Sequence, residues 1–256
     1  MGNHHFGENL NIEQVPTNQK LENIELPFGL RLRRKFVFWL IATLARILVR
    51  FENKGLEHIP NEGGLLLATN HMSRVDTGIL LLNSVRADIA AIVTDKYKTY
   101  PIISFMVNAM PHIWIDRSKA DFTAFSSAVK YLKKDGGVLG IAPEGTRSKN
   151  GALIEGKHGA AMIAMRAGVP IVPVGITGTE NFQSMVRRFR RQKVVANYGP
   201  VFNLPVMGKE EDRTSYMERC TEEVMCRIAA QLPEKYHGFY TGHPRIQEIL
   251  KEHKVE

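Results

Sequence analysis

The sequence predicts an α/β fold in which helices cover a largely parallel central sheet, with an N-terminal membrane-interfacial helical segment. Short apolar runs alternate with segments of helical periodicity through most of the chain. Continuous apolar runs are typical of strands buried on both faces, and the alternating order predicts parallel strands joined by right-handed crossovers. A basic and aromatic stretch ahead of this alternating part predicts the separate helical segment.

The individual elements follow from the same pattern. The predicted strands span residues 64–69, 89–93, 112–115, 138–142, 170–175 and 194–197. The predicted helices span residues 77–85, 102–110, 122–134, 159–167 and 215–231. We therefore divide the chain into a flexible segment at 1–28, an interfacial helix at 29–54 and an α/β domain at 55–256.

The composition suits one sizeable domain with a peripheral segment, because 44% of the 256 residues are hydrophobic and 23% are charged. Only two cysteines occur, Cys220 and Cys226, and both fall in a predicted helix. The helical rise separates them by about 9 Å, too far for a disulfide. We expect two ordinary thiols in a reducing compartment.

The formal net charge of +8 favours an anionic partner, such as nucleic acid, an anionic membrane surface or a phosphorylated substrate. The sequence shows no aromatic RNA-binding signature, zinc-ligand spacing or basic zipper. Nucleic acid is therefore not an expected partner. No clustered set of His and Cys residues predicts a metal site either.

The interfacial helix is predicted from a basic run at 31–35 followed by an apolar run at 36–45, about half the length needed to span a bilayer. If the segment is helical, an apolar stripe forms from Phe36, Trp39, Leu40, Thr43, Leu44, Ile47 and Phe51. The cations expected to reach lipid headgroups are Arg33, Arg34, Lys35, Arg46 and Arg50. This pattern favours a helix in the membrane interface, and a helix packed only on its own domain is the alternative.

Polar residues follow the predicted strands, where open parallel sheets place their ligands. The first strand is followed by NHMSRVD at 70–76, and later strands are followed by DR at 116–117, PEGTRS at 143–148 and ITGTE at 176–180. A base, two arginines, a carboxylate and turns rich in Gly and Thr are thus expected at one edge of the sheet.

His71 and Asp76 are five residues apart, and such residues diverge by about 140° on a regular helix. They can meet only if His71 lies in the turn before the helix, with Ser73 as the N-cap and Asp76 in the first turn. One interpretation is a capped helix start with an incidental histidine. The other is that Asp76 fixes the tautomer of His71, which acts as a general base.

The PEGTRS stretch combines a glycine that permits close backbone approach with an arginine that can bind phosphate. Glu144 can either order the turn or bind a substrate hydroxyl, and a polar surface turn is the simpler alternative. No serine-hydrolase elbow or Walker phosphate loop occurs. A histidine base without a protein nucleophile suggests direct activation of a substrate hydroxyl, and His112 and His158 are expected to be bystanders.

In these motifs the sequence resembles the glycerolipid acyltransferases typified by 1-acylglycerol-3-phosphate (lysophosphatidate) acyltransferase. Four ordered blocks carry the resemblance over about residues 50–205: N-H-x4-D at 70–76, the I-D-R block at 113–117, PEGTRS at 143–148 and VPIVPV at 169–174. The sequence departs from the family pattern at Pro111 and Trp114 in the second block, and at Ile141 and Ala142 before the third. These departures put acyl or acceptor preference in doubt, while the reaction class is unaffected.

The resemblance implies that the domain at 55–256 transfers a fatty acyl group from acyl-CoA or acyl-carrier protein to lysophosphatidate, at the cytoplasmic face of a membrane and without a bound cofactor. His71 would be the base and Asp76 its partner. The expected substrate-binding residues are Arg117, Glu144, Gly145, Thr146 and Arg147. Alternatives are acylation of glycerol 3-phosphate or another lysophospholipid, and a non-catalytic lipid-binding protein of the same fold.

Two further stretches allow two interpretations each. The aromatic and apolar stretch at 96–106 is predicted either to line an acyl groove or to be ordinary core and surface. The basic cluster at 187–193 is predicted either to contact anionic lipid or donor phosphates, or to be a solvated run of charge.

Overall fold

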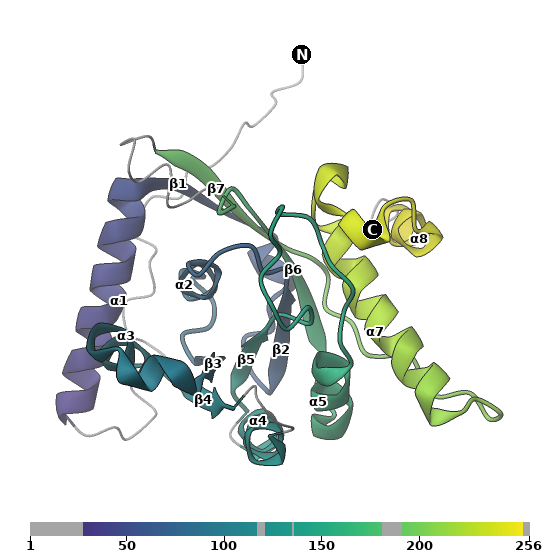
Figure 1. Ribbon diagram of the computed structural model, residues 1–256, viewed down its shortest axis with the longest axis horizontal. Helices are drawn as coiled ribbons and strands as arrows, with labels where there is room; N and C mark the ends of the chain where they lie inside the picture. Colours follow the sequence, from purple (N-terminus) through teal and green to yellow (C-terminus); the bar gives the residue numbers. More distant parts are fainter. Residues whose placement is uncertain (1–27, 117–120, 135, 181–190, 253–256) are drawn as a thin grey trace.

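The computed structural model of this chain describes residues 28–116, 121–134, 136–180 and 191–252. Within them, a seven-stranded sheet in the order β1-β7-β6-β2-β5-β3-β4 forms the centre of the molecule, with helices on both sides (Figure 1). The strands are β1 (Val49–Lys54), β2 (Leu65–Thr69), β3 (Ile89–Thr94), β4 (His112–Ile115), β5 (Val138–Ile141), β6 (Ile171–Thr177) and β7 (Gln192–Tyr198).

The sheet is mostly parallel, as predicted. Strands β2, β3, β4, β5 and β6 are parallel to one another. Strand β7 pairs antiparallel with β6, and β1 pairs in parallel with β7. Five strands therefore run in one direction and deliver their carboxyl ends to the same edge, which is where ligands bind in open sheets.

The longer helices are α1 (Phe28–Leu48), α4 (Phe122–Lys134), α5 (Gly159–Ala167), α7 (Arg213–Ala230) and α8 (Pro244–Glu252), and the shorter ones are α2 (Asp76–Leu80) and α3 (Pro101–Val107). Helix α7 begins at a good N-cap, because the Asp212 carboxylate accepts hydrogen bonds from two backbone amides. Helix α2 is shorter than the predicted 77–85, and α8 was not predicted. Short 3-10 turns occur at Leu56–His58, Asp95–Thr99, Glu234–Tyr236 and Gly238–Tyr240.

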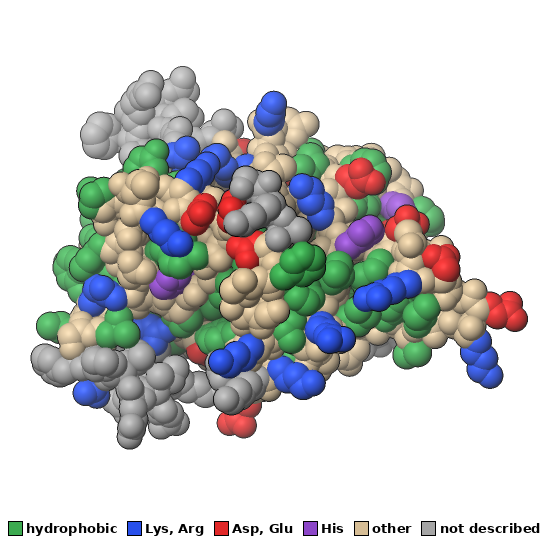
Figure 2. Space-filling model, turned by 60° about the horizontal axis from the view of Figure 1, so that its bottom comes forward, with side chains coloured by type: hydrophobic (Ala, Val, Ile, Leu, Met, Phe, Trp, Pro, Cys, Tyr) green, Lys and Arg blue, Asp and Glu red, His purple; other side chains and the backbone are tan. Residues whose placement is uncertain are grey.

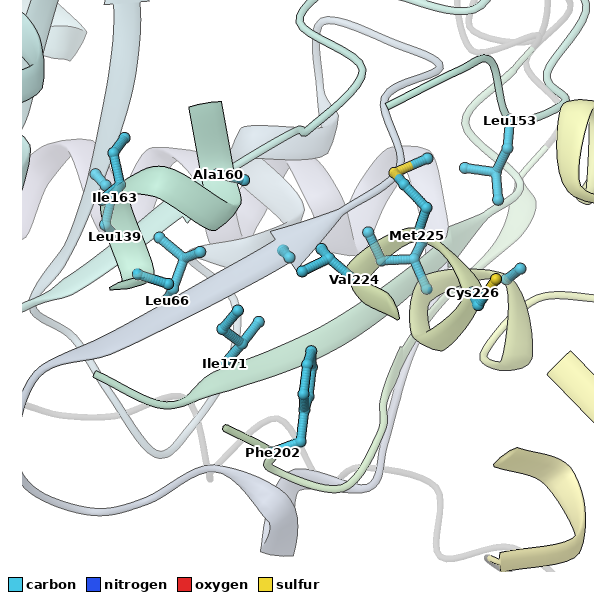
Figure 3. Packing of buried hydrophobic residues seen from close by; sticks show 14 of the residues in the cluster. Leu66, Leu139, Leu153, Ala160, Ile163, Ile171, Phe202, Val224, Met225 and Cys226 are labelled. Carbon is cyan, nitrogen blue, oxygen red and sulfur yellow. The ribbon is translucent and has the colours of Figure 1, made fainter. Parts of the chain in front are cut away.

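Alternate residues of the central strand β2 enter two separate hydrophobic cores. Leu66 packs with residues of α4, α5 and α7 on one face of the sheet, whereas Leu65 and Leu67 face α1 and α2. Figure 3 shows the first core, where Leu66 and its β6 neighbour Ile171 lie below side chains of α5 and α7. Burial on both faces explains why this strand is a continuous apolar run.

The N-terminal helix ends earlier than predicted. Residues 49–54 were expected to continue the helix, but they form strand β1, which pairs with β7 along its whole length. Phe51 therefore lies in the sheet and does not extend the helical stripe. The flexible segment predicted at 1–28 lies outside the described residues, except for Phe28 at the start of α1. None of the described helices is long and apolar enough to cross a membrane.

Helix α1 has one buried face and one exposed apolar face. Val37, Phe38 and Ile41 pack on the core beneath the sheet. The opposite face leaves large apolar side chains in solvent, among them Leu32, Phe36, Trp39, Leu44 and Ile47. One face of α1 thus packs on its own domain, and the membrane interface stays a prediction for the exposed face.

The cations of α1 differ in burial and contacts, which the sequence did not reveal. Arg34 is buried, and Arg33 donates to the carbonyl of Asn108 and covers the ring of Phe105 in α3. Lys35 stays exposed. At the α1 end of the molecule, apolar side chains lie next to Lys and Arg side chains (left side of Figure 2).

Candidate active site

The predicted site residues meet at the carboxyl edge of the sheet. The loop after β2 carries His71, the loop after β5 carries Glu144, and the loop after β6 carries Thr179. These three loops contact one another through hydrogen bonds between residues far apart in the sequence. Arg117 lies outside the described residues, as do residues 187–190 of the basic cluster.

His71 and Asp76 form the predicted pair. The Nδ1 atom of His71 lies 3.0 Å from Oδ2 of Asp76, and the two side chains are 22% and 2% exposed respectively. With Asp76 ionised, Nδ1–H donates to the carboxylate and Nε2 keeps its lone pair. The imidazole is thus oriented by a buried carboxylate and remains reachable from solvent, which is the arrangement of a general base.

The pair meets by a different route from the predicted one. Ser73 does not cap α2, because the N-cap position is Val75 and no side chain caps the helix there. Instead, Oδ2 of Asp76 accepts hydrogen bonds from the backbone amides of Met72 at 2.8 Å and Ser73 at 2.7 Å. The carboxylate reaches back to close the turn, and this places His71 against it.

The other oxygen of Asp76 has a partner that the sequence analysis missed. Thr179, which is fully buried, donates its hydroxyl to Oδ1 of Asp76 at 2.7 Å. Gly178 allows this contact because its φ is +87°, and a Cβ there would lie 2.1 Å from the carbonyl oxygen of Lys193. The Gly-Thr step after β6 was a visible signal, although its partner 103 residues away was not.

We expect Thr179→Val to lower kcat by roughly tenfold or more with little change in KM, because a hydrogen bond to a charged group is worth about 1.5–3 kcal/mol. Valine keeps the volume and removes the donor to Asp76. The matched control is Thr179→Ser, which keeps the hydroxyl and should stay within about threefold of the parent by the same energetic argument. Steady-state kinetics on both variants measure the effect, and equal activities would contradict the role given to this hydroxyl.

Glu144 takes the first of the two roles that its motif allowed, because it orders the turn. Its two carboxylate oxygens accept the backbone amides of His71 at 2.8 Å and Ile154 at 3.0 Å. The residue is 1% exposed, and this burial raises the pKa of its carboxyl group even though both amide bonds act to lower it. Glu144 is therefore a positioning residue that fixes the backbone next to the histidine.

The rest of the PEGTRS loop also bonds to the backbone of His71 and exposes polar side chains to solvent. The amide of Ser148 donates to the carbonyl of His71 at 2.8 Å, so this loop binds both the amide and the carbonyl of the histidine. Thr146 and Arg147 are exposed on the loop. Arg147 is thus an exposed cation directly before Ser148, the residue whose amide is bonded to the carbonyl of His71.

Lys157 is a further cation that the motifs did not indicate. Its amide donates to the carbonyl of Pro143 at 2.9 Å. A Cβ placed on Gly145 would lie 3.2 Å from Cδ of this lysine and 3.6 Å from Nζ. The lysine chain therefore lies along the turn. No sequence motif indicated this contact, because the two segments meet only through folding.

Asn70 has a structural role in the site. Its side-chain amide donates to the carbonyl of Ile176 at 2.9 Å and accepts from the amide of the same residue at 2.7 Å. This pair of bonds continues the β2–β6 pairing by one step beyond Thr69. The end of β2, and hence the position of His71, is fixed against the neighbouring strand.

The predicted bystanders have partners of their own among the described residues. His112 bonds to the carbonyl of Met110 at 2.9 Å, and His158 bonds to the hydroxyl of Thr221 at 2.9 Å. Cys220 and Cys226 are buried free thiols in α7, as predicted. Burial raises the pKa of Cys226 to about 12, so this thiol is not an activated nucleophile.

The fold and the site together define an α/β protein with a carboxylate-oriented histidine at the carboxyl edge of its sheet. A family model described as Acyltransferase matches residues 50–177, and the chain belongs to this acyltransferase family. The matched residues include the loop that carries His71 and Asp76 and the PEGTRS loop. They end at the start of the turn that leads to Thr179.

Relatives and a solved structure agree with this assignment. The chain is 26% identical over 75% of its length to the crystal structure of the 1-acyl-sn-glycerophosphate (LPA) acyltransferase PlsC from Thermotoga maritima, covering 76% of that chain with a TM-score of 0.56. It is 30% identical over 58% of its length to a 1-acyl-sn-glycerol-3-phosphate acyltransferase of Pseudomonas aeruginosa. The matched region is 59% of that relative and 51% of a relative from Borreliella burgdorferi with the same name. The chain thus spans little more than half the length of these relatives.

Proposed function

We propose that the protein transfers a fatty acyl group from an acyl thioester to the free hydroxyl of lysophosphatidate, giving phosphatidate for phospholipid biosynthesis. The observation that carries the proposal is the bond between the partly exposed ring of His71 and the buried Asp76. The exposed Arg147 directly precedes Ser148, whose amide bonds to the carbonyl of His71. The names of the relatives support the same acceptor. The proposed donor is acyl-CoA or acyl-carrier protein.

In the proposed reaction, Nε2 of His71 takes the proton of the acceptor hydroxyl as its oxygen attacks the thioester carbonyl. The new C–O bond gives a tetrahedral intermediate, and Asp76 stabilises the imidazolium that forms. The C–S bond then breaks, the carbonyl reforms, and the proton on Nε2 passes to the departing thiolate. The products are the acylated lipid and a free thiol, and no covalent acyl-enzyme is required.

The acceptor phosphate is proposed to bind at the PEGTRS loop. Arg147 supplies a guanidinium that can bind two phosphate oxygens together, and Lys157 adds an ammonium along the same turn. Gly145 and Thr146 shape the backbone between them. Arg117 is proposed as the second arginine of the site on the strength of its motif alone.

The test is a transfer assay in which purified protein is incubated with radiolabelled oleoyl-CoA and lysophosphatidate. Labelled phosphatidate is the expected product. A panel with glycerol 3-phosphate and other lysophospholipids, each tested with acyl-CoA and acyl-carrier protein, identifies the acceptor and the donor. If no acceptor is acylated with either donor, the protein is a lipid-binding member of the family and the proposed function is wrong.

We further propose that the exposed face of α1 binds the cytoplasmic surface of a membrane. Phe36 and Trp39 lie with ring centroids 6.1 Å apart, and Trp39 is 62% exposed. Ile102 of the neighbouring α3 is 77% exposed. Large apolar side chains next to an exposed Lys35 suit a surface where acyl chains and anionic headgroups meet.

The double variant Phe36→Ser, Trp39→Ser is expected to bind vesicles of phosphatidylcholine and phosphatidylglycerol at least tenfold more weakly, since burying one such side chain is worth about 1.5–3 kcal/mol. Vesicle flotation measures the binding. Val206→Ser is the matched control, because Val206 is 89% exposed but lies outside α1 and α3. Unchanged flotation of the double variant would exclude this face as the attachment site. Deleting residues 1–51 is a poorer test, since it removes half of strand β1.

A further inference from the structure

The C-terminal segment at 232–243 packs against the loop that follows PEGTRS. The amide of Leu153 donates to the carbonyl of Tyr236 at 2.8 Å, and the amide of Phe239 donates to the carbonyl of Leu153 at 2.9 Å. Both backbone groups of Leu153 are thus bound by the C-terminal segment. The Leu153 side chain is buried near Met225 and Cys226 of α7 (Figure 3).

Two tyrosines of the same segment add side-chain bonds to the site loops. Tyr240 accepts the amide of Gly156 at its hydroxyl oxygen, at 3.0 Å. Tyr236 donates its hydroxyl to Oε1 of Glu180 at 2.7 Å, directly after Thr179. Burial, followed by the nearby Glu180 carboxylate, raises the pKa of Tyr236 to about 12, so the hydroxyl keeps its proton.

The bonds continue from Leu153 to the histidine. The next residue, Ile154, donates its amide to Oε2 of Glu144, whose Oε1 accepts the amide of His71. Leu153, Ile154 and Glu144 thus link the C-terminal segment to the backbone of His71. The same segment also reaches Asp76 by a second path, from Tyr236 through Glu180 to the adjacent Thr179.

We propose that residues 232–240 of this segment, the tail clamp, are a positioning element that holds Glu144 and thereby the backbone of His71. The inference rests on the proposed function only for the role of His71 as a base. Transfer requires the reacting atoms to be held in a narrow geometry, and a displacement of about 1 Å can cost roughly 10²-fold in rate. The clamp is bonded to the site loops and is proposed to contact neither substrate, so its loss should lower kcat and leave KM unchanged.

A substitution at Gly238 is expected to disrupt the contact between the tail clamp and Leu153. Its φ is +52°, and a Cβ at this position would lie 2.2 Å from the carbonyl oxygen of Leu153. Gly238→Ala therefore pushes the segment off Leu153. Gly242→Ala is the matched control, because its φ of +75° gives similar backbone strain while nothing lies within 4 Å of the added Cβ.

The experiment compares both variants with the parent chain by steady-state kinetics and by hydrogen–deuterium exchange. For Gly238→Ala we expect kcat to fall at least tenfold, KM for lysophosphatidate and oleoyl-CoA to stay within about twofold, and the amides of His71 and Ile154 to exchange faster. Gly242→Ala should change none of these. Exchange at His71 and Ile154 that is the same in both variants would overturn the proposal, as would equal kcat values.

Tyr240→Phe covers the case in which Gly238→Ala does not fold. This variant removes only the acceptor for the amide of Gly156. We expect a smaller fall in kcat at constant KM. We also expect the amides of Gly156 and Ile154 to exchange faster. Parental kcat together with faster exchange would overturn the proposal. The exchange measurements do not depend on acyl transfer. If the parent chain acylates no acceptor, the proposed function is wrong, and exchange at His71 and Ile154 still tests whether the clamp holds this backbone.

Discussion

His71→Ala is expected to lower kcat for acyl transfer by roughly 10²- to 10⁴-fold, the range that general-base catalysis contributes. The ring is the only part of the residue that the substitution removes. The backbone bonds to Glu144 and Ser148 remain. Asp76 keeps its bonds from Met72, Ser73 and Thr179, so the fold should persist and the melting temperature should change little.

The measurement is the initial rate of phosphatidate formation, with thermal unfolding as the check on the fold. His112→Ala is the control, because His112 lies at the start of β4, away from the carboxyl end of the strand, and its ring contacts the carbonyl of Met110 and the ring of Trp114. It should retain parental turnover. Activity of His71→Ala within about threefold of the parent would rule out this histidine as the base, given the range above.

Asp76→Asn is expected to lower kcat by about 10³- to 10⁴-fold, because the orienting carboxylate fixes the imidazole tautomer and stabilises its protonated form. An asparagine has one acceptor oxygen in place of two. In the parent, one oxygen of Asp76 accepts hydrogen bonds from His71, Met72 and Ser73, and the other accepts a hydrogen bond from Thr179. Asparagine cannot accept at both positions. Unlike His71→Ala, this change should also destabilise the protein, by about 1–3 kcal/mol for buried donors left without a partner.

Kinetics and thermal unfolding together separate the two effects. At a temperature where Asp76→Asn is fully folded, the loss of kcat should remain, and ¹⁵N spectra of the His71 ring should show a changed tautomer. Thr179→Val at the same temperature should fall between the parent and Asp76→Asn, because it removes a single donor. An Asp76→Asn protein with parental kcat would show that this carboxylate serves only the turn.

The sequence was sufficient to predict most of the sheet because its central strands are buried on both faces and read as apolar runs. Strand β1 was missed for a physical reason. It is an edge strand whose middle residues are half-buried in a row without alternation, and Phe51 happens to continue the helical spacing of the preceding stripe. Helix α8 was missed as well. It is held to α7 by ion pairs such as Arg245 to Glu223, which depend on chain segments that meet only in the fold.

The site shows the same division between local and long-range information. The meeting of His71 and Asp76 is local and was predicted, although the capping role of Ser73 was wrong because the carboxylate bonds to the amides itself. Thr179 could not be paired with Asp76 from one sequence, since a buried hydroxyl leaves no periodic pattern. The same holds for the contact of Gly238 with Leu153.

Strand β1 begins at Val49 immediately after α1 ends at Leu48, so no linker separates the helix with the exposed apolar face from the sheet that positions His71. A protein attached to lipid through this helix would therefore hold its catalytic edge at one fixed tilt and height above the headgroups. Turnover would then follow the two-dimensional density of the acceptor in the bilayer, and diluting lysophosphatidate with inert lipid at constant bulk concentration would slow the enzyme.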